Sequence, residues 1–141
     1  MNISPEVKKA FELACNVQKR AYAPYSNFQV GASFKIKNRD EYTVGCNVEN
    51  ASFGATVCAE RGAIQTTIGQ IGGKPDFEFL VVVTNTDPCI GPCALCLQVL
   101  SEFVGPDFPI YLGNPKGIQT QVKFSDLLGK PFSTIPEQIE S

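Results

Sequence analysis

Apolar residues three or four positions apart define one helix face near the N-terminus: Val7, Ala10, Phe11, Ala14, Val17 and Ala21. This spacing predicts an α-helix that ends at about Arg20. Ser4 and Pro5 support its start, as an N-cap and a proline at the first helical position. Cys15 lies within this helix, where we expect a packed thiol.

Five segments carry the pattern of β-strands: 28–36, 42–48, 77–85, 108–112 and 118–124. In the first segment Val30, Ala32 and Phe34 alternate with other residues, which predicts that they share one face. A turn at 38–40 should join the first two segments as a hairpin. The third segment contains the nearly continuous apolar run 79–83, which suits a strand covered on both faces.

Helices are predicted between and after these strands. The first of them starts near Cys58 and runs to about Ile68, and the second runs from Pro92 to about Phe103. The buried positions of the second are expected to be Leu97, Leu100 and Phe103. A short helix should follow at 125–128. Because helices alternate with strands, we expect the α/β class, as a three-layer α/β/α sandwich on one mixed sheet of about five strands.

The composition fits a single catalytic domain over residues 1–141. Hydrophobic residues make up 43% of the chain and charged residues 18%, as in soluble globular proteins. The formal net charge is −2, without a block of like charge, which argues against a nucleic-acid partner and favours a small-molecule substrate. The N-terminus is polar and no apolar run reaches transmembrane length. We therefore expect a cytoplasmic protein with no membrane partner.

Cysteine and glutamate residues form the candidate chemistry. Cys58 lies two positions before Glu60, and Cys93 lies three positions before Cys96. Cys93 and Cys96 share one face of a helix start, and Cys58 starts another predicted helix. Helix N-termini stabilise thiolates, which are good zinc ligands. Three thiolates leave the fourth tetrahedral position for water, which is the pattern of a catalytic zinc.

Two other interpretations of these cysteines remain open at this point. The chain has six cysteines and no histidine, so any metal site must use thiolates and carboxylates. Cys89 could close a structural four-cysteine zinc site, although such a site gives Glu60 no role. A disulfide pair is the second alternative, and a cytoplasmic location disfavours it. Arg61 follows the acid, and we hypothesise that it donates to a sulfur and offsets the negative charge of the thiolates.

Asn47 and Glu49 are a candidate sugar site. They lie two positions apart, so in an extended segment they point to the same side. An amide and a carboxylate together can donate to and accept from a sugar hydroxyl. From spacing alone, a solvated strand end remains the alternative.

The chain resembles the small, single-domain cytidine deaminases. The resemblance rests on four segments: 23–32 (APYSNFQVGA), 45–53 (GCNVENASF), 57–61 (VCAER) and 92–103 (PCALCLQVLSEF). They contain the signature of zinc deaminases, in which His or Cys, any residue and Glu precede Pro-Cys-x-x-Cys. Two departures stand out. Ala94, Leu95 and Leu97 replace the usual Gly, Ala and Arg, and 53–56 differs from the usual Tyr-Pro-Leu-Gly.

The resemblance implies roles for individual residues. Cys58, Cys93 and Cys96 would bind one Zn²⁺ per subunit, and Glu60 would be the catalytic proton shuttle. The implied substrate contacts are Phe28, Asn47, Val48, Glu49 and Ala59. Arg61 and Phe53 would support the site. The implied assembly is a homotetramer whose active sites are shared between subunits.

The implied function is hydrolytic deamination of free cytidine and deoxycytidine to uridine and deoxyuridine, in pyrimidine salvage. Hydroxide generated at the zinc would attack C4 while Glu60 transfers protons, and ammonia would leave. Deamination of another aminated pyrimidine, or of a base within nucleic acid, is an alternative. A non-enzymatic zinc-stabilised binding module is another. Asn47 and Glu49 favour a free nucleoside, because they suit a free sugar.

Overall fold

One mixed sheet of five strands forms the centre of the molecule. A computed structural model describes residues 1–139, so positions 140 and 141 of the predicted domain lie outside it. The strands are β1 (Val30–Ile36), β2 (Tyr42–Cys46), β3 (Phe77–Thr84), β4 (Pro109–Asn114) and β5 (Gly117–Lys123). Their order is β2-β1-β3-β4-β5. β3 and β4 run parallel, whereas the other neighbours are antiparallel, which confirms the predicted mixed sheet.

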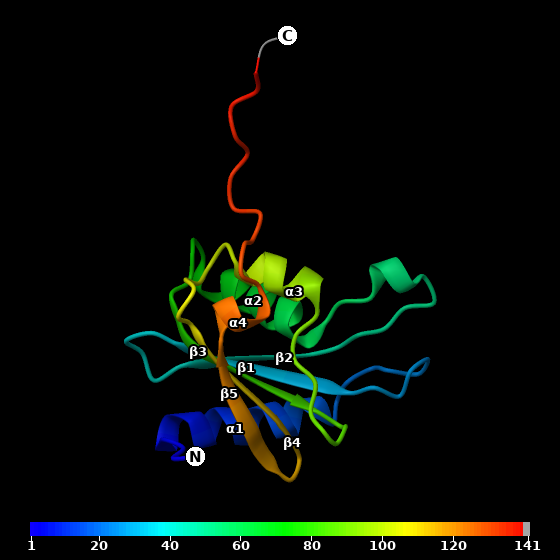
Figure 1. The fold of residues 1–141 in the computed structure, drawn as a ribbon. Coiled ribbons are helices and arrows are strands. Elements are labelled where there is room, and N and C mark those ends of the chain that lie inside the picture. The colour runs from blue at the N-terminus through cyan, green and yellow to red at the C-terminus, as the bar shows by residue number, and fades with distance from the viewer. Residues whose placement is uncertain (140–141) are drawn as a thin grey trace.

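Helices cover both faces of this sheet, as predicted (Figure 1). The helix α1 (Pro5–Gln18) packs on β1, β2 and β3 from one side. On the other side lie α2 (Ala59–Ile71), α3 (Ala94–Leu100) and α4 (Phe124–Leu127). Each helical layer has its own apolar cluster against the sheet, and Cys15 packs at the edge of the α1 cluster, as expected. No helix within residues 1–139 is long and apolar enough to cross a bilayer.

The ends of several elements differ from the prediction, α3 most of all. Cys93 has an extended backbone and caps the helix, and after Leu100 the chain continues in tighter turns, with Phe103 N donating to Leu100 O. The helix is therefore shorter than the predicted Pro92 to Phe103. Leu97 and Leu100 are buried, but Phe103 is only half-buried, so its predicted burial was wrong. In contrast, α2 continues three residues beyond its predicted end.

Two glycines allow helices to approach the sheet closely enough to place the candidate site. A Cβ atom on Gly31 of β1 would lie 2.1 Å from the carbonyl oxygen of Ala14 in α1. A Cβ atom on Gly45 of β2 would lie 2.4 Å from the carbonyl oxygen of Ala59 in α2. Both distances are far below van der Waals contact. The absence of a side chain at Gly45 therefore permits the first turn of α2, with Glu60, to pack directly on β2.

Both faces of β1 are buried, because α1 covers the face opposite α2. This buries Lys35, whose residue surface is only 5% exposed. Its ammonium lies 3.3 Å from a Glu78 carboxylate oxygen and 3.8 Å from one of Glu6, and it donates to the carbonyls of Ile36 and Arg39. A buried charge is tolerated when it is paired and hydrogen-bonded in this way. Lys35 thus connects the β1–β2 turn to α1 and β3.

Candidate active site

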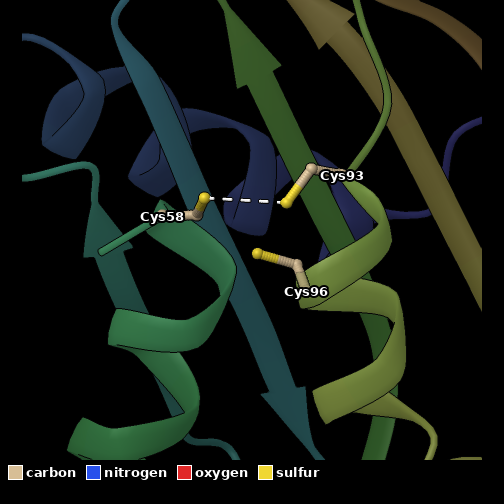
Figure 2. Close-up of side chains that lie close together, drawn as sticks. All are labelled: Cys58, Cys93 and Cys96. Carbon is tan, nitrogen blue, oxygen red and sulfur yellow. Dashed lines mark hydrogen bonds between the residues drawn. The ribbon is translucent and has the colours of Figure 1, made fainter. Parts of the chain in front are cut away.

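Three cysteine side chains meet between the starts of α2 and α3. Cys58 caps α2 and Cys93 caps α3, both with extended backbones, and Cys96 lies in the first turn of α3. Figure 2 shows the three sulfurs turned toward one another. All three Sγ atoms lie within 4.8 Å of one another, and those of Cys58 and Cys93 are 3.7 Å apart. The predicted grouping of these three residues is confirmed.

The spacing of these sulfurs fits a zinc ion. A tetrahedral zinc with Zn–S bonds of about 2.3 Å separates its sulfur ligands by about 3.8 Å. The Cys58–Cys93 distance of 3.7 Å matches that separation. A hydrogen bond from the Cys96 thiol, helped by Arg61, holds the pKa of Cys58 well below its ordinary value. The donor set is therefore three soft sulfurs with a preformed thiolate, which is the chemistry that zinc prefers.

The two alternative interpretations of the cysteines find no support in this geometry. Cys89 is not part of the sulfur group, and its backbone N–H donates to Gln119 Oε1 on β5. All six cysteines are free thiols, and the Cys58–Cys93 distance is far beyond the roughly 2 Å of a disulfide bond. The group keeps only three protein ligands among residues 1–139, as an open zinc site does.

Glu60 lies in the first turn of α2, beside the sulfur group. It is 3% exposed, and burial raises the pKa of its carboxyl group to about 7. A carboxyl group with a pKa near neutrality can both accept and donate a proton under physiological conditions. This is the property that a proton-transfer group needs.

Arg61 extends from α2 toward Cys58. Its Nη2 donates to Cys58 Sγ at 3.7 Å and to the Thr56 carbonyl at 3.1 Å. The hydrogen bond with Cys58 raises the pKa of Arg61 further, so the guanidinium stays charged. The structure thus has the sulfur contact that we hypothesised for this residue.

We expect the substitution Arg61→Gln to lower kcat/KM roughly 10- to 100-fold, as is typical for loss of a partner that orients a metal ligand. Glutamine removes the positive charge that offsets the thiolates. Steady-state kinetics on zinc-loaded protein, with zinc content measured in parallel, check this. Arg20→Gln serves as the control, since Arg20 is an exposed arginine just after α1 and is not part of the cavity lining. Unchanged activity in Arg61→Gln would contradict the hypothesis.

A cavity of about 410 Å³ opens next to the sulfur group. Its volume lies in the range of about 300–1,000 Å³ that is usual for small-molecule sites. Six of the predicted site residues line it: Phe28, Asn47, Glu49, Cys58, Glu60 and Cys93. The structure therefore brings together residues from the start of β1, the end of β2 and the starts of α2 and α3.

Hydrogen bonds hold Asn47 and Glu49 at the cavity. Asn47 Oδ1 accepts from Val30 N at 2.8 Å, and its Nδ2 donates to Phe28 O at 2.7 Å. One Asn47 N–H remains for a ligand. Glu49 Oε1 accepts from the backbone N–H groups of Tyr25 and Ser26. The pair therefore offers a donor and an acceptor side by side, which is the arrangement that we predicted for a sugar hydroxyl.

Besides Cys96, whose sulfur belongs to the sulfur group, four predicted site residues lie outside the cavity lining. Val48 is exposed and forms isolated bridges with Tyr22 and Val57. Ala59 is fully buried under Gly45. Arg61 lies on α2 and donates to Cys58 Sγ, and Phe53, 78% exposed, packs edge-on against Tyr25. Their substrate-binding or supporting roles stay predictions.

Residues that the sequence did not single out also line the cavity, among them Thr84 and Ile90. Thr84 ends β3, and its hydroxyl accepts from the backbone N–H of Ile90 at 3.2 Å, which anchors the loop before Pro92. Ligand sites in α/β proteins lie beyond the carboxyl ends of strands. The position of Thr84, a polar residue at the end of the predicted strand 77–85, was therefore the sequence signal that could have identified it as a cavity residue.

Comparison with known proteins agrees with this geometry. Residues 4–111 match the family model for the cytidine and deoxycytidylate deaminase zinc-binding region. A cytidine deaminase from Sporosarcina psychrophila is 36% identical over 128 residues, covering 91% of this chain and 92% of the relative. One from Halalkalibacterium halodurans is 38% identical over 120 residues, covering 85% and 89%. The crystal structure of cytidine deaminase from Burkholderia pseudomallei superposes with a TM-score of 0.82 at 37% identity, covering 92% of this chain and all of that one. The chain therefore belongs to the cytidine deaminase family, with Cys58, Cys93 and Cys96 as its zinc-binding triad.

Proposed function

We propose that this cytidine deaminase hydrolyses free cytidine and deoxycytidine, with Glu60 as the proton-transfer group and residues 1–141 as one catalytic domain. The observation that carries the proposal is the meeting of an open three-sulfur zinc site with a buried carboxyl group in one cavity. A purely structural zinc would leave Glu60 without a function. Its burial beside the thiolates costs free energy, which a catalytic role explains.

The chain's own residues provide the proton transfers of the reaction. When bound, zinc supplies Lewis-acid chemistry that makes water nucleophilic at neutral pH. Glu60 takes a proton from this water while the water oxygen attacks C4 of the base. Glu60 then delivers that proton to N3. Next, Glu60 moves the second proton of that water from the hydroxyl on C4 to the 4-amino group, the C4–N bond breaks, and ammonia leaves. One water is consumed, and a carbonyl replaces the amine. General acid–base steps of this kind contribute about 10²- to 10⁴-fold in rate each.

The charge of the cavity favours a nucleoside over a nucleotide. Among the described residues, its lining includes the carboxylates of Glu49 and Glu60 and the thiols of Cys58 and Cys93, and neither lysine nor arginine. A phosphate would meet carboxylates and no cationic side chain in this lining, so no side-chain ion pair would offset the cost of its desolvation. In contrast, a sugar hydroxyl finds the free N–H of Asn47 and a carboxylate oxygen of Glu49. The same reasoning disfavours a base within a polynucleotide.

We further propose a cytoplasmic homotetramer with active sites shared between subunits. Several exposed apolar side chains lie close in sequence to residues of the cavity lining or belong to it: Tyr25, Phe53, Ile90 and Leu95. Exposed apolar surface near a site favours coverage by another subunit. Leu97, where the family usually has an arginine, is buried in the core. It is therefore not available for a contact between subunits, and we assign that contact to the exposed apolar residues. Six free thiols agree with a reducing compartment.

Ammonia release from zinc-loaded protein tests this function. We expect turnover of cytidine and deoxycytidine, and a kcat/KM at least about 100-fold lower for deoxycytidine monophosphate, cytosine and a cytosine-containing oligonucleotide. Cytosine lacks the hydrogen-bonded sugar, and the monophosphate and the oligonucleotide carry a phosphate that the cavity repels. Either difference accounts for a factor of about 100. Equal turnover of the monophosphate would contradict the charge argument. Stoichiometric zinc with no turnover of any substrate would return the chain to the class of zinc-stabilised binding modules.

A further inference from the structure

We propose that Ser26 is a positioning residue for substrate binding, because its hydroxyl fixes the Glu49 carboxylate in the orientation that a sugar hydroxyl requires. The proposal rests on the function proposed above. Ser26 lies in the loop between α1 and β1, 23 positions from Glu49 in sequence. Ser26 is not one of the residues that line the cavity, so its hydroxyl would act on the substrate only through Glu49.

The Ser26 hydroxyl connects two cavity residues. Its Oγ donates to Glu49 Oε2 at 2.5 Å and accepts from the backbone N–H of Phe28 at 3.0 Å. Glu49 Oε1 accepts from the backbone N–H groups of Tyr25 at 2.9 Å and Ser26 at 3.1 Å. Both carboxylate oxygens are therefore anchored on one loop, and the plane of the carboxylate is fixed by three donors.

The acceptor positions of Glu49 determine what remains for the substrate. A carboxylate has about four lone-pair positions, two on each oxygen. Two donors occupy Oε1 and one occupies Oε2, so Oε2 of Glu49 keeps one position. The Ser26 hydroxyl determines which direction that position faces. Its hydrogen bond is also the largest cause of the lowered pKa of Glu49, so the group stays an acceptor.

This geometry predicts a defect in binding that depends on one substrate hydroxyl. Without the Ser26 hydroxyl, Oε1 remains anchored but Oε2 can turn away from the sugar. The chemistry at C4 depends on Glu60 and the zinc site, which Ser26 does not contact. We therefore expect Ser26→Ala to raise KM for cytidine roughly tenfold, as loss of one hydrogen bond to a charged group does, while kcat changes less than about twofold.

Steady-state kinetics on zinc-loaded protein with cytidine, 3′-deoxycytidine and 5′-deoxycytidine test the proposal. The KM increase should disappear for the analogue that lacks the hydroxyl bound by Glu49. Ser26→Thr, which keeps a hydroxyl, should restore KM. In a Glu49→Ala background, Ser26→Ala should have little further effect. Ser125→Ala is the matched control, because this serine of α4 takes part in none of the described hydrogen bonds of Glu49.

The outcomes separate this proposal from the proposed function. Wild-type protein that releases no ammonia from cytidine would overturn the proposed function, and this proposal with it. Wild-type turnover with an unchanged KM in Ser26→Ala would overturn the role of Ser26 alone. An equal KM increase with all three substrates, or additive effects of Ser26→Ala and Glu49→Ala, would also overturn that role, because either result would mean that Ser26 acts on the loop and not through Glu49.

Discussion

Replacing Glu60 by glutamine is expected to reduce kcat for cytidine by at least about 10²- to 10⁴-fold while the protein still binds zinc. The amide has nearly the size and shape of the carboxyl group but cannot cycle a proton, so the general acid–base contribution is lost. The buried site of Glu60 on α2 accommodates glutamine without a change in volume. Ammonia release gives kcat, and metal analysis of the same sample gives the zinc content.

The control for this substitution is Glu12→Gln, which makes the same chemical change at an exposed position of α1, on the opposite side of the sheet. It should leave kcat and zinc content unchanged. If Glu60→Gln kept most of the wild-type activity, Glu60 could not be the proton shuttle. A binding module with a structural zinc would give that result, so the experiment also separates the two classes of function.

The zinc site could be predicted from the sequence because its geometry is local. Cys93 and Cys96 lie one helical turn apart, so spacing alone places their side chains on one surface, and Cys58 and Glu60 both lie at the start of one helix. The pairing of Asn47 with Glu49 follows in the same way from the period of an extended chain. Only the contact between the two helix starts is long-range. It could be expected because both helix starts carry cysteines, which are zinc ligands.

The features that were missed depend on contacts between distant segments. The hydrogen bonds from Ser26 and Tyr25 to Glu49 span more than twenty positions, and no periodicity encodes them. In the sequence Lys35 is a polar residue on a strand of alternating pattern, yet α1 covers it. The early end of α3 is a further case, since helix propensity continues past Leu100, whereas Glu102 N and Phe103 N donate to carbonyls only three positions earlier. Tertiary packing decides each of these.

We expect Cys93→Ala to abolish stoichiometric zinc binding and, with it, cytidine turnover. Removing one of three thiolates leaves two protein ligands, too few for the usual coordination of protein-bound zinc. Cys93 lies at the exposed N-cap of α3, so alanine leaves no internal cavity, and the two apolar clusters on either side of the sheet stay intact. The protein should therefore remain folded. Metal analysis after dialysis, thermal unfolding and ammonia release measure the three quantities.

Cys89→Ala is the matched control, because it deletes the other thiol near α3, which lies outside the sulfur group. It should keep about one zinc per chain and full activity, as expected of an open site with three protein ligands. Zinc loss in both variants would instead indicate a closed four-cysteine site, and there the buried carboxyl group of Glu60 would have no water to act on. Retained zinc in Cys93→Ala would show that Cys93 is not a ligand. Because the two substitutions remove the same atoms only four positions apart, a difference in zinc content between them can be assigned to coordination.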